Sequence, residues 1–235
     1  MSATVDVRQK SAFASDQEIE RVRRATKARP PIGSPFDLSP EALDAMEARF
    51  DQLSSGEMCK ASLSARRAAT SGNLYYLKSH LAWAINYVRT CNEAGRIDLD
   101  DEKTQAAFTF MQMADHLFGR WEHHPLFSLI SKSIVLEYPH AVTQLLAATY
   151  LSDLGTTTGF NNPADFSGQS PDLFINANPL ETISLEVKAP QELQWPSPCP
   201  SPAALEDLLA KQIHKASKQI TGEWGRSGFR RFVGK

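Results

Sequence analysis

The first half of the chain carries apolar residues at helical spacing. The serine, proline and glutamate at 39–41 are typical of a helix start, because serine caps free amide groups and proline suits the first turn. Apolar residues then recur at intervals of three and four, as a half-buried helix requires: Leu43, Met46, Phe50 and Leu53. The same spacing predicts helices within 74–95 and 100–121. Residues 39–125 are therefore expected to be entirely helical.

Beyond residue 125 the pattern changes to a mixture of helix and strand. Residues 139–155 predict a helix that starts at a proline and ends at a glycine. Apolar residues at 173–175 and a period-two alternation over 182–187 predict two strands, which a turn at 176–179 joins into a hairpin. The proline-rich stretch 195–202 is expected to be a loop, because proline lacks the amide hydrogen that helices and sheets use.

The last segment predicts an amphipathic helix and carries an excess of basic residues. Over 202–220 the spacing places the following residues on one buried stripe: Leu205, Leu208, Leu209, Ile213, Ala216 and Ile220. Lysine and arginine outnumber aspartate and glutamate over 203–235, although the whole chain has a net charge of −2. A phosphate-contacting surface and a solvated helix face with a basic tail both fit this pattern.

The changes in hydrophobic pattern along the sequence divide the chain into three parts. Residues 1–38 are expected to form a tail, a short helix at 16–28 and a proline-containing linker. Residues 39–125 form the helical region, and residues 126–235 form a mixed domain of helices and strands. The expected fold class is therefore α+β or α/β.

Composition limits what the protein can do. Hydrophobic residues make up 42% of the chain and charged residues 22%, which is typical of a soluble globular protein. No stretch approaches the ~18 apolar residues of a membrane span, and the N-terminus lacks the apolar core of a signal peptide, so we expect a cytoplasmic protein without a membrane partner. The cysteines Cys59, Cys91 and Cys199 form no CxxC pair, so neither a zinc knuckle nor a disulfide framework is indicated.

A group of histidines lies near the end of the helix predicted over 100–121. His116, Glu122, His123 and His124 do not follow the spacing of the HExxH motif or of another tight set of metal ligands. We expect these residues to lie on the surface or at a helix end.

The predicted hairpin brings together charged residues of complementary chemistry. Asp172 stands at the start of one strand, and Glu186 and Lys188 project from one face of the other, because alternate strand residues share a face. Two converging carboxylates with a lysine beside them suit a divalent cation, since Mg²⁺ prefers hard oxygen ligands. Such an ion lowers the pKa of a bound water and neutralises charge on a phosphate. Asp165 is a second acid that could replace Asp172, although its sequence context is typical of a turn.

The stretch that contains Pro171-Asp172 and Glu186-Val187-Lys188 resembles the signature of the PD-(D/E)XK nuclease superfamily, which has the restriction-endonuclease-like fold. The predicted order over about 137–235 is similar to that family's αβββα core, namely a helix, a strand, the hairpin and an amphipathic helix. The resemblance implies further strands after the last helix, where this chain ends, so the core is expected to be truncated at the C-terminus. It does not cover the helical first half.

The resemblance implies a role for each matching residue. Asp172 and Glu186 would hold a metal ion, which would be Mg²⁺ or alternatively Mn²⁺. The main-chain carbonyl of Val187 would be a further ligand, and Lys188 would position the attacking water.

The family also takes supporting residues from its two helices. It often uses one further acid from the first helix, and Glu137 is the nearest candidate, although the Tyr138-Pro139 pair disfavours a continuous helix there. Polar residues of the second helix would support the site and contact nucleic acid. The candidates are Lys211, Gln212, Lys215 and Gln219.

Three functions are consistent with the sequence. The first is a metal-dependent nuclease acting on nucleic acid, with DNA favoured, whose helical region selects the substrate or a protein partner. The second is a nuclease-like protein that binds nucleic acid or a protein partner without catalysis, which the missing strands favour. The third is a mostly helical scaffold in which the motif is accidental. Convergence of Asp172, Glu186 and Lys188 within about 4–6 Å would favour the first two functions.

Overall fold

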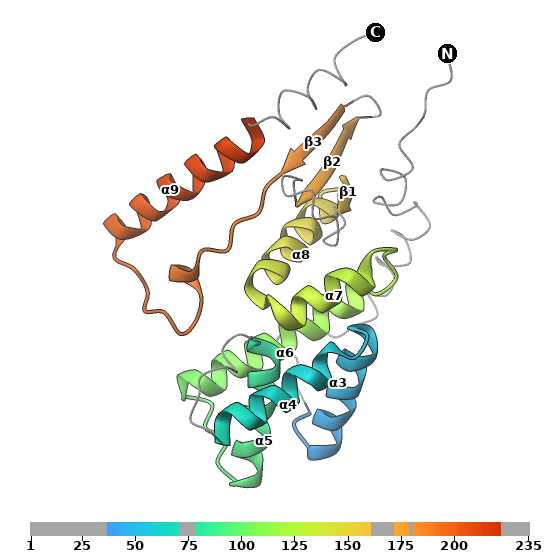
Figure 1. Ribbon diagram of the computed structural model, residues 1–235, viewed down its shortest axis with the longest axis vertical. Coiled ribbons are helices and arrows are strands. Elements are labelled where there is room, and N and C mark those ends of the chain that lie inside the picture. The colour runs from blue at the N-terminus through green and yellow to red at the C-terminus, as the bar shows by residue number, and fades with distance from the viewer. Residues whose placement is uncertain (1–36, 71–78, 161–171, 179–180, 222–235) are drawn as a thin grey trace. The chain divides into compact units, whose positions relative to one another are not determined.

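The computed structural model describes residues 37–70, 79–160, 172–178 and 181–221 (Figure 1). These residues belong to two separate units, a helical unit over 37–142 and a second unit over 143–221 that contains the sheet. The division falls inside one helix, after Val142, whereas the sequence pattern changes at about residue 126. The helix expected at 16–28 lies outside the described residues.

The described part of the helical unit contains only helices as regular structure. Its helices are α3 (Pro40–Leu53), α4 (Glu57–Thr70), α5 (His80–Glu93), α6 (Glu102–Trp121) and α7 (Phe127–Leu136). The sequence predicted α3, α5 and α6, and the structure confirms them. No described helix, in either unit, is long and apolar enough to cross a membrane.

Two helices of this unit were not predicted. Helix α4 buries Met58, Ser62 and Ala65, a set with only one large apolar side chain, so its buried face is weakly marked in the sequence. Helix α7 buries Phe127, Ile130, Ser131, Ile134 and Val135, which follow helical spacing. The spacing of α7 is therefore visible in the sequence, since it matches the pattern of a half-buried helix.

The predicted starts of α3 and α6 are confirmed by their capping side chains. The hydroxyl of Ser39 accepts a hydrogen bond from the Ala42 amide at 3.2 Å. At α6, the carboxylate of Asp101 accepts one from the Thr104 amide at 2.8 Å, and the Tyr87 hydroxyl donates to the same oxygen at 2.8 Å. These side chains satisfy amide groups that have no partner within the helix.

An aromatic cluster forms the centre of the helical unit. The fully buried ring of Phe50 stacks on that of Phe118, with 4.9 Å between the ring centroids. Phe118 also meets the edge of Phe127 at 5.4 Å. These contacts join α3, α6 and α7, and large buried rings of this kind dominate the packing energy of a small unit.

Helices α7 and α8 (Tyr138–Asp153) are separated by a single residue, Glu137. Glu137 is the C-cap of α7 with φ −132° and ψ 48°, which is not a helical conformation. The break expected next to Tyr138-Pro139 is therefore present. Tyr138 is buried and its hydroxyl donates to the Phe110 carbonyl at 2.9 Å, and burial raises the pKa of its phenol.

The second unit contains a three-stranded antiparallel sheet in the order β1-β2-β3. Strand β1 (Thr157–Phe160) pairs with β2 (Leu173–Asn178), and β2 pairs with β3 (Glu181–Leu185). Leu173 pairs with Phe160 on one side and with Leu185 on the other. The predicted hairpin is thus confirmed, and the order α8, β1, β2, β3 and α9 (Pro202–Thr221) gives an α+β fold (Figure 1).

Two predicted boundaries of the hairpin were wrong. Asn176, Ala177 and Asn178 belong to β2 and not to the turn, because the backbone stays paired with β3 through Asn178. Strand β3 ends at Leu185, so Val187 lies beyond it. The loop expected at 195–202 is confirmed up to Ser201, with only a short 3₁₀ turn before it at Gln191–Leu193.

The buried stripe predicted for α9 was partly wrong. Leu208 is buried, but Leu209 and Ile213 have exposed fractions of 47% and 69%. The face that is at least half-buried runs through Leu205, Leu208, Gln212 and Ala216. The apolar residues of α9 extend around more of the helix than the part that is buried. Spacing alone therefore overestimated how much of the helix would be buried.

We predict that Phe50→Ala lowers the free energy of unfolding of the helical unit by about 3–5 kcal/mol, because it removes a buried ring and leaves a cavity. Denaturant unfolding followed by circular dichroism measures this change. Leu63→Ala on α4, where the side chain is exposed, is the control and should change the free energy by less than about 0.5 kcal/mol. Equal losses for the two variants would contradict this core.

We predict a pH-dependent role for Asp101. Hydrogen bonds from the Tyr87 hydroxyl and the Thr104 amide hold the pKa of Asp101 below its ordinary value of 3.8, while burial raises the pKa of Tyr87 to about 12. Since the folded-state pKa is lowered, the stabilisation is complete above pH 3.8 and is lost as the pH falls through the folded-state value. The stability difference between wild type and Asp101→Asn should therefore shrink between pH 5 and pH 2. A difference that stays constant across this range in thermal unfolding would count against the network.

Candidate active site

Asp172 and Glu186 flank the last pair of the hairpin. The ladder between β2 and β3 ends with Leu173 opposite Leu185, where Asp172 directly precedes Leu173 and Glu186 directly follows Leu185. Both acids therefore lie at the open end of the hairpin, just beyond its paired residues.

A hydrogen bond joins Asp172 to the other strand. The main-chain amide of Val187 donates to Oδ2 of Asp172 at 2.7 Å. The Val187 amide thus bonds to a side-chain carboxylate, whereas β3 ends two residues earlier, at Leu185. Bonds of this kind to a charged oxygen are stronger than neutral ones. The bond ties Asp172 to the segment that carries Glu186 and Lys188.

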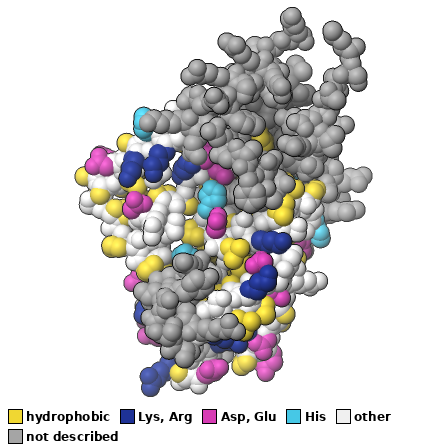
Figure 2. All heavy atoms as spheres, in the orientation of Figure 1, with side chains coloured by type: hydrophobic (Ala, Val, Ile, Leu, Met, Phe, Trp, Pro, Cys, Tyr) yellow, Lys and Arg dark blue, Asp and Glu magenta, His cyan; other side chains and the backbone are white. Residues whose placement is uncertain are grey.

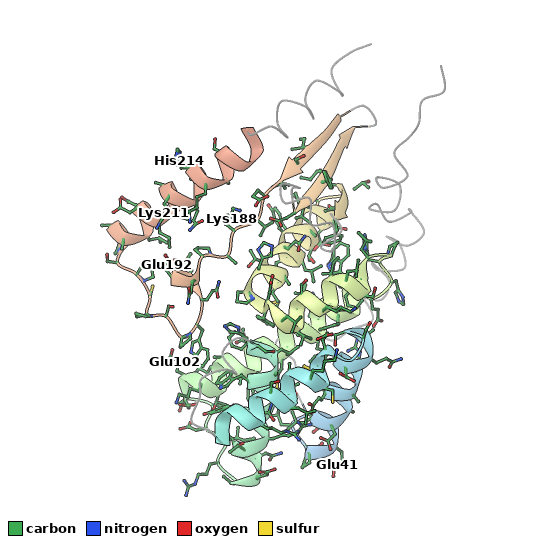
Figure 3. All side chains as sticks on the ribbon, viewed as in Figure 1. Glu41, Glu102, Lys188, Glu192, Lys211 and His214 are labelled. Carbon is green, nitrogen blue, oxygen red and sulfur yellow. The ribbon has the colours of Figure 1, made fainter. Side chains whose placement is uncertain are left out.

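Lys188 lies against Glu186, as the alternation of strand residues predicts. Its Nζ donates a hydrogen bond to Oε1 of Glu186 and forms an ion pair with it. The side chains have exposed fractions of 27% for Lys188 and 11% for Glu186. Figure 3 shows Lys188 on the segment that follows β3. The structure thus brings Glu186 and Lys188 together in a partly buried pair, which solvent screens less than an exposed one.

Gln144 also reaches this site, and the sequence did not predict it. From α8, its Nε2 donates to the main-chain oxygen of Asp172 at 2.8 Å. Gln144 is half-buried and stands next to the fully buried Leu145. Gln144 is one of several polar residues on α8, and its spacing does not distinguish it from the others, so only the folded structure could reveal the contact.

The candidate residues on α9 differ in exposure. Lys211 and Lys215 are exposed, Gln212 is half-buried, and the side chain of Gln219 lies outside the described residues. Figure 2 shows basic side chains gathered over α9, and Figure 3 shows Lys211 and His214 along this helix. Within the described side chains of α9, Lys211 and Lys215 are balanced by the exposed Glu206 and Asp207, and the other basic residues of the predicted excess lie outside them.

Glu137, the further acid considered from the sequence, is exposed and belongs to the helical unit. Its role as a metal ligand stays a prediction. Pro171 of the motif and the alternative acid Asp165 lie outside the described residues.

One expectation for the histidine group was wrong. His124 is only 4% exposed, because the chain turns after α6 and the ring packs against Trp121, with 6.0 Å between centroids. Its Nδ1 accepts from the Leu126 amide at 3.1 Å. His123 is exposed, and Glu122 is the C-cap of α6, as expected for surface and capping residues.

The hairpin offers a small set of oxygen donors. Nowhere in the described residues do three or more acidic, histidine or cysteine side chains form a group that could hold a metal ion. The hairpin differs from such a group, because it presents two carboxylates and the main-chain carbonyl of Val187. Mg²⁺ is commonly held by one or two carboxylates and keeps several waters, so this donor set fits it.

Comparison with known proteins does not assign a family. No family model matches the chain, and neither the curated proteins nor the solved structures contain a significant match. The resemblance to PD-(D/E)XK nucleases therefore rests on the motif and hairpin of this chain alone.

Proposed function

We propose that the protein is a metal-dependent nuclease that hydrolyses phosphodiester bonds of nucleic acid, with DNA as the expected substrate. The observation that carries this proposal is the arrangement at the open end of the hairpin. Asp172 and Glu186 flank the last strand pair, Asp172 accepts from the Val187 amide, and Lys188 is bonded to Glu186. This arrangement agrees with the roles that the PD-(D/E)XK resemblance implies.

The oxygen donors of the hairpin favour a divalent cation. Asp172, Glu186 and the Val187 carbonyl would hold Mg²⁺, or Mn²⁺ in its place, since both accept hard oxygen ligands. When bound, the ion supplies positive charge that lowers the pKa of a water and offsets charge on the phosphate.

The chain's own residues would orient the reaction. Lys188 places an ammonium group beside Glu186 and offsets the negative charge of that carboxylate. Its remaining N–H groups can donate to the attacking water or to a phosphate oxygen, because an ammonium carries three donors. Among the described residues of the site, Lys188 is the one that presents positive charge, so it is the residue we expect to hold the nucleophile in place.

The exposed lysines of α9 would contact the backbone of the nucleic acid. Lys211 and Lys215 are one helical turn apart, which places both on the same side of the helix. Phosphate contacts of this type position the substrate without reading its sequence, and they weaken as the salt concentration rises.

The test is cleavage of supercoiled, linear and single-stranded DNA with Mg²⁺ or Mn²⁺. We predict that Glu186→Gln and Lys188→Met each lower the cleavage rate by roughly 10²–10⁴-fold, because each removes a group that acts on the reacting atoms. The matched controls are Glu192→Gln and Lys103→Met, which change exposed residues outside the site and should leave the rate unchanged.

A folded wild-type protein that cleaves none of these substrates with either metal would overturn the nuclease proposal. In that case, salt-dependent DNA binding that is lost in a Lys211→Ala, Lys215→Ala double variant would favour the alternative, a protein that binds nucleic acid without catalysis.

A further inference from the structure

Gln144 connects α8 to the first residue of the hairpin site. Its amide group donates to the Asp172 carbonyl at 2.8 Å, while the carboxylate of the same aspartate accepts from the Val187 amide at 2.7 Å. Asp172 is thus held at its main chain from α8 and at its side chain from the segment after β3. We infer that Gln144 is a positioning residue, which fixes the main chain of Asp172 so that its carboxylate stays bonded to the Val187 amide; its consequence for metal binding rests on the proposed function.

The position of Asp172 explains why it requires such support. The ladder between β2 and β3 stops at Leu173 and Leu185, so the strand pairing does not include Asp172. A carboxylate that binds a cation must keep its orientation, and a side chain at the end of a strand can swing with its backbone. The bond from Gln144 limits this movement, because α8 is a helix anchored by the buried side chains of Leu145 and Ala148.

The chemistry of the contact requires an amide donor at position 144. The partner is a carbonyl oxygen, which only accepts hydrogen bonds, and the NH₂ group of glutamine supplies the hydrogen. Methionine has nearly the same length but has no hydrogen to donate. Gln144→Met therefore removes the bond while keeping most of the packing, which separates positioning from space filling.

The chain contains a matched control for this change. Nε2 of Gln105 on α6 donates to the Leu99 carbonyl at 3.0 Å, which is the same type of bond in the helical unit. Gln105→Met removes an equivalent bond and makes the same chemical substitution. Any effect that is common to both variants reports a general loss of stability.

The experiment uses the full chain and two measurements that do not depend on cleavage. Hydrogen exchange of the Val187 amide, followed by NMR without metal, reports how well the Asp172 carboxylate is held. Calorimetric titration with Mn²⁺ reports the affinity of the site. In Gln144→Met we expect faster exchange at Val187 and a dissociation constant for Mn²⁺ that rises about 10–100-fold, the usual cost of losing a residue that orients a metal ligand. Gln105→Met should leave both values unchanged.

The outcomes separate this inference from the proposed function. Unchanged Val187 exchange in Gln144→Met overturns the positioning role, whatever the metal titration shows. Faster exchange with unchanged Mn²⁺ affinity overturns the link between Gln144 and the metal. Faster exchange together with a wild type that binds no Mn²⁺ supports the positioning of Asp172 and overturns the proposed metal-dependent function. If Gln144 only stabilised the fold, the melting temperature of Gln144→Met would fall more than that of Gln105→Met, and the affinity for Mn²⁺ would stay the same.

Discussion

The hydrogen bond from the Val187 amide to the Asp172 carboxylate is the interaction on which the candidate site depends. It joins the two strands of the hairpin at their open end, beyond the last pair of the ladder. Because the amide belongs to the residue between Glu186 and Lys188, the same bond holds the segment that carries both of these side chains against Asp172.

The two units divide the physical tasks of the chain. The helical unit buries a cluster of aromatic and aliphatic side chains around Phe50 and Phe118, which provides stability through apolar burial. The second unit has a small sheet with a polar end, where carboxylates and a lysine replace apolar contacts. Charged groups that are partly removed from water cost stability unless they are paired, and here Lys188 pairs with Glu186.

Sequence reasoning worked where the determining interactions are local. Ser39 was identified as a helix start because a cap acts within a few residues of its own position. The pairing of β2 with β3 followed from the two-residue repeat of a strand. Helix α4 was not predicted, since few of its buried residues are large and apolar. Helix α7 was not predicted either, although its buried residues follow helical spacing.

The sequence by itself therefore determined the helical first half, the hairpin and the candidate residues Asp172, Glu186 and Lys188, because capping and alternation act between near neighbours. Only the tertiary structure decided that His124 is buried, that Leu209 and Ile213 are exposed, and that Gln144 contacts Asp172. Each of these depends on which parts of the chain pack together, and those parts can be far apart in the sequence. Local spacing carries no information about such a partner, so burial and long-range hydrogen bonds appear only when the chain is folded.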